Sequence, residues 1–236
     1  MSNARTLART NIDRQVAALQ QLYGAVDQPQ YNWLVESVSE IGKANYTRRV
    51  MIAGVGKNSN IASKISETMA SLGLPSFYLN VSHCGHGDFG FIGPNDMIIH
   101  ISRSGMTREM LEAIKHIRLI RPQVEQVLIH CKPEKAVNED VDFEICIGAV
   151  KEGDEHGLAP TTSTTALLCF LDCVAVQASH NIGFERLDFL KFHPDGALGA
   201  MLKQETALKR GAELMDNEAD RRDHGDPYGT QGQEFK

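Results

Sequence analysis

The sequence lacks the features of a membrane protein and of a nucleic-acid-binding protein. It has no uninterrupted apolar run near the ~20 residues that span a bilayer, and its first residues lead into an amphipathic pattern rather than a signal peptide. Lys and Arg form no basic stripe and the formal net charge is −6, whereas nucleic acid requires clustered cations. We therefore expect a cytoplasmic protein that binds neither membrane nor nucleic acid.

Cysteine is scarce, and its number is odd. Five cysteines in a chain without a secretion signal indicate a reducing compartment rather than a disulfide framework. Four of them fall in apolar segments and are expected to be small buried side chains: Cys131, Cys146, Cys169 and Cys173. Cys84 differs because it lies in an expected loop beside histidines.

The sequence also lacks internal repeats, and its 236 residues suit one domain with appendages. Apolar runs of strand length alternate with amphipathic segments of helix length, which predicts an α/β fold whose parallel sheet is covered by helices on both faces. The expected strands are 49–55, 75–81, 96–101, 124–131 and 143–148, and the main helices are 61–72, 108–119 and 161–179. The order of the strands stays open.

Helical spacing of apolar residues predicts two further helices before the first strand. We treat residues 1–48 as N-terminal helices packed alongside the sheet and residues 49–202 as the core of the same domain. Another helix is expected over 203–215. Residues 216–236 are polar with almost no apolar side chains, which is typical of a disordered tail.

Hydroxyls and a glycine follow the third expected strand, in Ser102-Arg103-Ser104-Gly105-Met106-Thr107. A strand, a hydroxyl-rich turn and a helix N-terminus make an anion site, because backbone N–H groups and the helix dipole point to the same place as the hydroxyls. Phosphate is the expected occupant. The alternative is an ordinary turn in which Ser or Thr caps the helix.

A glycine turn follows the first expected strand, in Gly54-Val55-Gly56-Lys57-Asn58-Ser59. It has neither the spacing of a Walker loop nor the third glycine of a dinucleotide fingerprint. Loops that follow parallel strands share one sheet edge, so we expect a second wall of the same pocket, with Lys57 supplying positive charge. A plain turn with a solvated lysine is the alternative.

Two histidines, His83 and His86, follow the second expected strand and flank Cys84. They can face a substrate or hold an adventitious zinc ion. The pattern requires no metal, because no C-x-x-C pair or third close ligand accompanies them. We expect His86 to face the substrate; a turn in which Asp88 caps a helix and the histidine packs is the alternative.

An acidic loop and a run of hydroxyls precede the long apolar helix. A carboxylate held near a sugar phosphate and away from water can have a raised pKa and act as a general base. Spacing alone does not choose among Glu152, Asp154 and Glu155, and a solvated acidic loop is the alternative. The hydroxyls exceed the needs of one helix cap and predict a further ligand contact: Thr161, Thr162, Ser163, Thr164 and Thr165.

An imidazole in a rigid turn appears near the end of the domain, at His193-Pro194. Alone, this pattern is more typical of a capping histidine than of a catalyst.

Taken in order, these motifs resemble the sugar isomerase (SIS) domain over about residues 50–202. The resemblance rests most on 157–164 and 192–199, together with 54–59, 86–90 and 102–107. Within that superfamily the chain is most similar to the arabinose-5-phosphate isomerases.

The resemblance implies a three-layer α/β/α fold with a five-stranded parallel sheet. It implies interconversion of D-arabinose 5-phosphate and D-ribulose 5-phosphate through a cis-enediol, with no cofactor, on the route to the lipopolysaccharide sugar Kdo. It also implies a homotetramer whose active sites lie at subunit interfaces. Full-length relatives carry a pair of CBS domains after the SIS domain, and we expect none in this chain.

The resemblance further implies roles for individual residues. Glu152 matches the proton-transferring base, His193 a group for ring opening or proton shuttling, and Lys57 a group that polarises oxygens, with His86 in the same pocket. Hydroxyls would hold the phosphate: Ser59, Ser102, Ser104, Thr107, Thr161, Ser163 and Thr164.

The chain departs from the family pattern at the centre of the phosphate loop. Met106 stands where the family usually has glutamate, and Arg103 stands where relatives often have asparagine. A thioether exchanges no protons. The alternatives are therefore an isomerase of a different phosphosugar and a non-catalytic, sugar-phosphate-binding regulator.

Overall fold

The structure is a computed structural model that describes residues 2–44, 46–134, 137–195, 199–201, 203–205 and 207. The chain divides into two units, Met1–Phe184 and Glu185–Lys236, and each is described by itself. The first unit holds the whole sheet and the helices that cover it.

A parallel sheet of five strands forms the centre of the first unit, in the order β2-β1-β3-β4-β5. The strands are β1 (Val50–Gly54), β2 (Ser76–Leu79), β3 (Met97–Ser102), β4 (Glu125–His130) and β5 (Phe143–Cys146). Every residue of β1 and β3 is buried, which is why both read as continuous apolar runs. The predicted five-stranded parallel sheet is confirmed.

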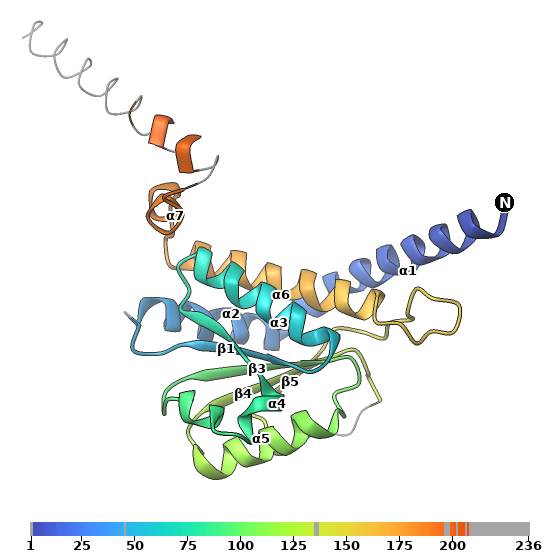
Figure 1. Cartoon of the computed structure of the whole chain (residues 1–236), viewed down its shortest axis with the longest axis horizontal. Helices are drawn as coiled ribbons and strands as arrows, with labels where there is room; N and C mark the ends of the chain where they lie inside the picture. Colours follow the sequence, from blue (N-terminus) through green and yellow to red (C-terminus); the bar gives the residue numbers. More distant parts are fainter. Residues whose placement is uncertain are drawn as a thin grey trace, which may run out of the picture. The chain divides into compact units, whose positions relative to one another are not determined.

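Helices cover both faces of this sheet (Figure 1). One layer contains α1 (Ser2–Val26), α2 (Pro29–Lys43), α3 (Lys57–Ser71) and α6 (Thr162–Asn181). The other contains α4 (Val81–Cys84), the 3-10 turn Asp88–Phe91 and α5 (Arg108–Ile120). The three-layer α/β/α architecture is therefore confirmed, and both N-terminal helices pack in the layer of α6.

Helix α6 is the one described helix that is long and apolar enough, by length and composition, to cross a membrane. It contacts α1, α2 and α3, and Phe170, Leu171 and Val174 are fully buried. Tyr31 of α2 meets the Phe170 ring edge-on, with ring centroids 5.6 Å apart. A helix with neighbours on several sides needs apolar residues around most of its circumference, so these contacts mark α6 as the core helix of the first unit.

The strand order places a topological switch point, the usual position of a ligand crevice in such sheets, at the carboxyl ends of β1 and β3. From β1 the chain runs first to β2 on one side, and β3 then pairs with β1 on the other side. Gly54 at the end of β1 pairs in register with Ile101 of β3. The loops after these two strands leave in opposite directions, and open α/β sheets bind ligands at such a switch point.

Of the four cysteines expected to be buried, Cys131 is buried, Cys146 and Cys169 are half-buried, and Cys173 is not buried. Cys84 is buried because α4 packs it against the sheet, whereas Cys173 is exposed on α6. Burial raises the pKa of the Cys84 thiol to about 11. The thiol is therefore protonated at neutral pH.

The second unit contains α7 (Arg186–Phe192), which begins with a capping box between Glu185 and Asp188. Residues 199–201, 203–205 and 207 are also helical. The remainder of the helix predicted over 203–215, and the whole tail 216–236, lie outside the described residues.

Gly54 provides a test of the close contact between β1 and α3. A Cβ at this position would approach the backbone carbonyl of Asn58 closely. Gly54→Ala should therefore lower the free energy of unfolding by about 1–3 kcal/mol, measured by urea denaturation. Gly85→Ala is the matched control, because its backbone is already helical and nothing lies within 4 Å of its Cβ position. Equal stability of the two variants would contradict the close contact.

Candidate active site

The β1 loop forms the first wall of the crevice. Gly56 has a φ of 62°, a left-handed conformation that favours glycine, and it turns the chain directly into α3. Lys57 is the first residue of α3; it is exposed and makes no hydrogen bond or ion pair with another described residue. The Ser59 hydroxyl donates to the Gly56 carbonyl at 2.7 Å.

The β3 loop forms the second wall. The Ser102 hydroxyl is buried, accepts from the Gly105 N–H at 3.1 Å and lies 3.1 Å from the Thr107 hydroxyl. The Ser104 hydroxyl accepts from the Met106 N–H, also at 3.1 Å. The loop hydroxyls therefore hydrogen-bond to the loop's own N–H groups and to one another. Within six residues, the loop brings together the hydroxyl and N–H groups that the sequence predicts for a phosphate site.

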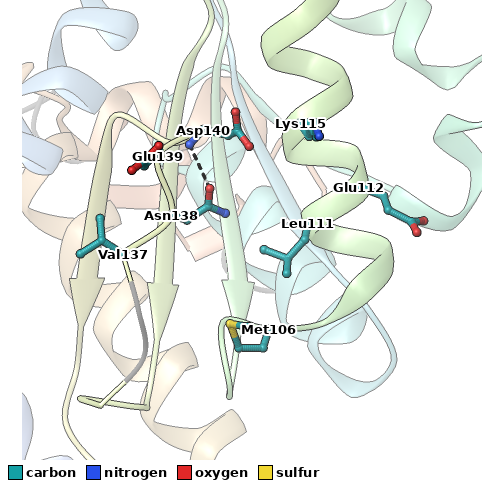
Figure 2. Close-up of a pocket in the computed structure, with 8 residues that line it drawn as sticks. All are labelled: Met106, Leu111, Glu112, Lys115, Val137, Asn138, Glu139 and Asp140. Carbon is teal, nitrogen blue, oxygen red and sulfur yellow. Dashed lines mark hydrogen bonds between the residues drawn. The ribbon is translucent and has the colours of Figure 1, made fainter.

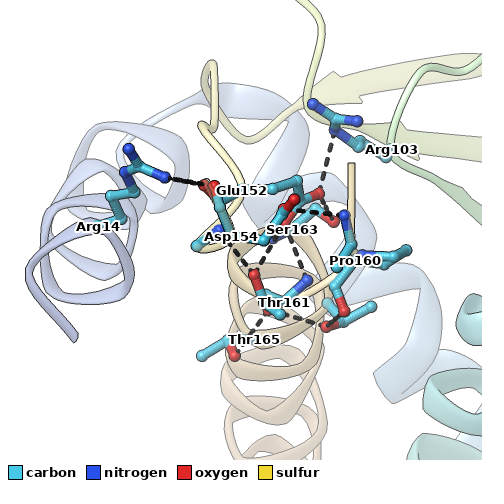
Figure 3. A network of polar contacts seen from close by, with 11 residues as sticks. Arg14, Arg103, Glu152, Asp154, Pro160, Thr161, Ser163 and Thr165 are labelled. Atoms are coloured by element: carbon cyan, nitrogen blue, oxygen red, sulfur yellow. Dashed lines mark hydrogen bonds and ion pairs between the residues drawn. The ribbon is translucent and has the colours of Figure 1, made fainter. Parts of the chain in front are cut away.

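The carboxylate of Glu152 lies at the N-terminus of α6 and is fully buried (Figure 3). Its Oε2 accepts from the Thr161 N–H at 2.9 Å, the Ser163 N–H at 3.2 Å and the Thr161 hydroxyl at 3.4 Å. Its Oε1 accepts from the Ser163 hydroxyl at 2.5 Å and pairs with Nε of Arg103 at 3.1 Å. Glu152 therefore caps α6 and joins it to the β3 loop.

The expectation of a raised pKa is wrong for Glu152. Burial alone would raise its pKa, but the Ser163 hydroxyl, the N–H groups of Thr161 and Ser163, and the Arg103 guanidinium together hold it below its usual value. The chain therefore keeps this buried side chain as an anion.

The three candidate carboxylates differ in environment. Glu152 is buried, Glu155 is exposed, and Asp154 accepts from the N–H groups of His156 at 3.2 Å and Ala159 at 2.9 Å. Asp154 thus shapes the loop that leads to Pro160. Of these three carboxylates, Glu152 is the one with a described ion pair to the β3 loop, through Arg103.

Sequence reasoning missed Arg14 of α1. Its Nη1 donates to the backbone carbonyls of Glu152 at 2.6 Å and Asp154 at 2.9 Å (Figure 3). The next residue, Gln15, accepts from the Thr165 hydroxyl at 2.8 Å through its side-chain oxygen. The sequence does contain a signal for this contact: Asn11, Arg14 and Gln15 are polar residues on a helix that is expected to pack against the core.

The hydroxyls at the start of α6 have unequal roles. Those of Thr161 and Ser163 bond to Glu152, and the Thr164 hydroxyl donates to the Thr161 carbonyl at 2.8 Å. Among the described residues, Thr162 Oγ1 and Asn58 Oδ1 are two of the buried polar side-chain atoms that have no hydrogen-bond partner. Asn58 lies in the first turn of α3 and Thr162 in the first turn of α6, so each of these turns keeps a buried oxygen that is free to bond to a ligand.

The histidines after β2 are exposed and lie at the end of α4 and in the turn that follows. Asp88 makes no capping bond to the 3-10 turn. Within the described ranges, no three His, Cys, Asp or Glu side chains gather as a metal site would require. The roles expected for His83 and His86 remain predictions.

His193 belongs to the second unit, directly after α7. Its ring stacks on Phe189 with centroids 3.8 Å apart, and Nδ1 lies 3.0 Å from the Phe189 carbonyl. A carbonyl only accepts, so Nδ1 carries the proton and Nε2 keeps its lone pair in the neutral ring.

Two cavities lie beside the β3 loop. Met106 and Arg103, the two residues at which this loop departs from the family pattern, line different cavities. Met106 lines one of about 460 Å³ together with Leu111 and Val137 (Figure 2). Arg103 lines the other, of about 390 Å³, together with Ser104 and Lys132. The position at which the family usually has glutamate therefore faces a different cavity from the residue that contacts Glu152.

The structure thus defines a parallel α/β protein with a hydroxyl-rich loop at the switch point of its sheet. A model of the SIS domain family matches residues 45–177, more than half of the chain. The chain therefore belongs to the SIS domain family.

Curated relatives and solved structures are similar to this chain. It is 38% identical over 154 residues to arabinose 5-phosphate isomerase KdsD of Yersinia pestis, covering 65% of this chain and 46% of the relative. It is 33% identical over 213 residues to arabinose 5-phosphate isomerase KpsF of Escherichia coli CFT073, covering 90% and 62%. The chain thus spans about half the length of the first of these curated relatives.

A solved structure of an E. coli CFT073 protein in complex with arabinose 5-phosphate is similar, with a TM-score of 0.72 and 28% identity. The match covers 82% of this chain and 98% of that one. The alignment therefore includes nearly all of the solved domain.

The ion pair of Glu152 predicts a pH-dependent stability. Because its pKa is lower in the folded than in the unfolded chain, its stabilisation is complete above the usual Glu value of about 4.3 and is lost as pH falls through the folded pKa. Glu152→Gln should lower the free energy of unfolding by about 2 kcal/mol at neutral pH, by urea denaturation, and the difference should shrink in acid. Glu155→Gln, which removes an exposed neighbouring carboxylate, should change little. A pH-independent deficit in Glu152→Gln would contradict an ionised Glu152.

Proposed function

We propose that this protein is an aldose–ketose isomerase of sugar phosphates that interconverts D-arabinose 5-phosphate and D-ribulose 5-phosphate through a cis-enediol. One observation carries the proposal: Glu152 is buried, has a lowered pKa and forms an ion pair with Arg103 of the β3 loop. The names of the KdsD and KpsF relatives support the choice of substrate.

The β3 loop is the phosphate-binding element in this proposal. The hydroxyls of Ser102, Ser104 and Thr107 already hydrogen-bond within the loop at 3.1 Å, and a phosphate would replace these partners with stronger, charge-assisted ones. Gly105, with a φ of 65°, lets the backbone turn towards such an anion. Ser59 and Thr164 would complete the grip from the first turns of α3 and α6.

Isomerisation moves a proton between the first two carbons of the sugar. Glu152 takes the proton from C2 of the aldose and returns it to C1 of the enediol. Lys57, exposed at the start of α3, polarises the sugar oxygens on which negative charge develops. His193, through the lone pair on Nε2, and His86 assist ring opening and proton transfer between oxygens. The steps assigned to these residues need no redox or nucleotide cofactor.

Assembly and location belong to the same proposal. We propose a cytoplasmic homotetramer with active sites completed at subunit interfaces. Large apolar side chains exposed on α1 support an interface there: Leu7, Ile12, Val16 and Tyr23.

Proton exchange in deuterated water tests the isomerase directly. With arabinose 5-phosphate, NMR should show ribulose 5-phosphate accumulating with deuterium at C1, and deuterium at C2 of the arabinose 5-phosphate that re-forms from the enediol. Glu152→Gln should slow both by at least about 10²-fold, because a general base contributes that much or more. Glu155→Gln is the matched control and should retain the wild-type rate.

A non-catalytic regulator is the competing function, and Met106 favours it. Tight binding of phosphosugars without any deuterium incorporation, over a panel of pentose and hexose phosphates, would establish the regulator and overturn the isomerase. If deuterium exchange occurs only with a different phosphosugar, the protein is still an aldose–ketose isomerase, but its substrate is not arabinose 5-phosphate.

Met106→Glu tests whether the lost carboxylate limits catalysis. Because Met106 lines the cavity of Leu111 and Val137 rather than that of Arg103, we expect the exchange rate to stay within about twofold, since a general base must lie within hydrogen-bond reach of the proton it takes. An increase of tenfold or more would show that position 106 contributes to the reaction.

A further inference from the structure

Both carboxylate oxygens of Glu152 are engaged in the free protein. Three hydrogen bonds reach Oε2, from the N–H groups of Thr161 and Ser163 and from the Thr161 hydroxyl, and one reaches Oε1, from the Ser163 hydroxyl. Each carboxylate oxygen offers about two lone-pair sites, and the Arg103 guanidinium forms an ion pair with Oε1 through Nε at 3.1 Å. A base role for Oε1 therefore requires that one of these groups move away from it.

The four hydrogen-bond donors and the Arg103 guanidinium differ in how easily they can move away. The N–H groups of Thr161 and Ser163 belong to the fixed first turn of α6, and the Ser163 side chain is buried. The Thr161 hydroxyl is further held by the Gly153 N–H, which donates to it at 2.8 Å. Arg103 is different: its side chain is 45% exposed, so it can move without disturbing helix or core.

The position of Arg103 in the chain supplies a reason for it to move. Its neighbours Ser102 and Ser104 are two of the hydroxyl residues in the phosphate loop, and its side chain lines the 390 Å³ cavity together with Ser104 and Lys132. A phosphate held by this loop would be a doubly charged acceptor beside the guanidinium. Arginine binds phosphate through two parallel N–H donors, whereas one nitrogen, Nε, is in contact with Glu152 here.

We propose that Arg103 is a positioning residue that holds Glu152 in the free protein and transfers to the phosphate of a bound sugar phosphate, which frees Oε1 of Glu152 for the sugar. This inference rests on the proposed function. It makes the base available only when a phosphorylated ligand is present. Glu152 and phosphate then compete for the same guanidinium, and this competition can be measured by binding alone.

A double-mutant cycle with arabinose 5-phosphate as the probe measures that competition calorimetrically. Arg103→Gln should weaken binding by about tenfold, since a charged hydrogen-bond partner of the phosphate is lost. Glu152→Gln should tighten binding by about threefold, because Arg103 no longer has to leave a carboxylate. In the Arg103→Gln background the same Glu152→Gln change should have no effect within about twofold.

Kinetics and a conservative variant distinguish a positioning role of Arg103 from a purely structural role. Arg103→Gln should raise KM far more than it lowers kcat, because Glu152 is unmasked in that variant. Arg103→Lys should recover part of the affinity, since an ammonium also pairs with phosphate through one contact point. Lys43→Gln, which removes a cation paired with Glu40 on the surface of α2, is the control and should leave affinity unchanged.

The possible outcomes are distinguishable. If Glu152→Gln tightens binding equally with and without Arg103, Glu152 repels the phosphate directly and the proposal is overturned. Unchanged affinity in Arg103→Gln overturns it as well, and this exposed substitution does not depend on the folding of Glu152→Gln. If binding shows the predicted coupling but no turnover occurs, the exchange of partners by Arg103 stands and the proposed isomerase activity is overturned. If neither arabinose 5-phosphate nor inorganic phosphate binds, both proposals are overturned.

Discussion

The buried carboxylate of Glu152 is the interaction on which the rest of the site depends. It satisfies the first N–H groups of α6, pairs with Arg103 after β3, and has its own backbone carbonyl held by Arg14 of α1. Three segments far apart in the sequence therefore meet at one residue. An anion at a helix N-terminus is favourable on its own, and here the same charge fixes where the phosphate loop and the core helix meet.

This arrangement explains how a negative charge persists in the interior. Burial disfavours the charged form, but hydrogen bonds and a guanidinium outweigh that cost. A carboxylate stabilised so thoroughly is a weak base in the free protein. In the proposed reaction, helix capping and proton transfer place opposite demands on the Glu152 side chain, and the exposed Arg103 is the group whose movement would satisfy both.

Much of the fold could be predicted because it follows from local patterns. Continuous apolar runs such as Val50–Gly54 and Met97–Ser102 are buried on both faces, which only a parallel sheet between helix layers allows. The site motifs after β1 and β3 followed from the rule that ligands bind at the carboxyl edge. What could not be predicted depends on contacts between distant residues. The lowered pKa of Glu152 needs Arg103 and Ser163, and no spacing in the sequence places those groups around it. Arg14 lies 138 residues from Glu152, and Cys173 is exposed, contrary to expectation, because helix packing sets which side faces the core.

The contact of Arg14 has a consequence for how the functional unit is delimited. The SIS family model matches residues 45–177, and α1, which precedes that segment, supplies the side chain that holds the backbone carbonyls of Glu152 and Asp154. The segment that the family model covers therefore does not contain every contact that fixes Glu152. Helix α1 supports a carboxylate that lies outside it, and substitutions in α1 can shift that carboxylate without altering any residue of the β3 loop or of α6.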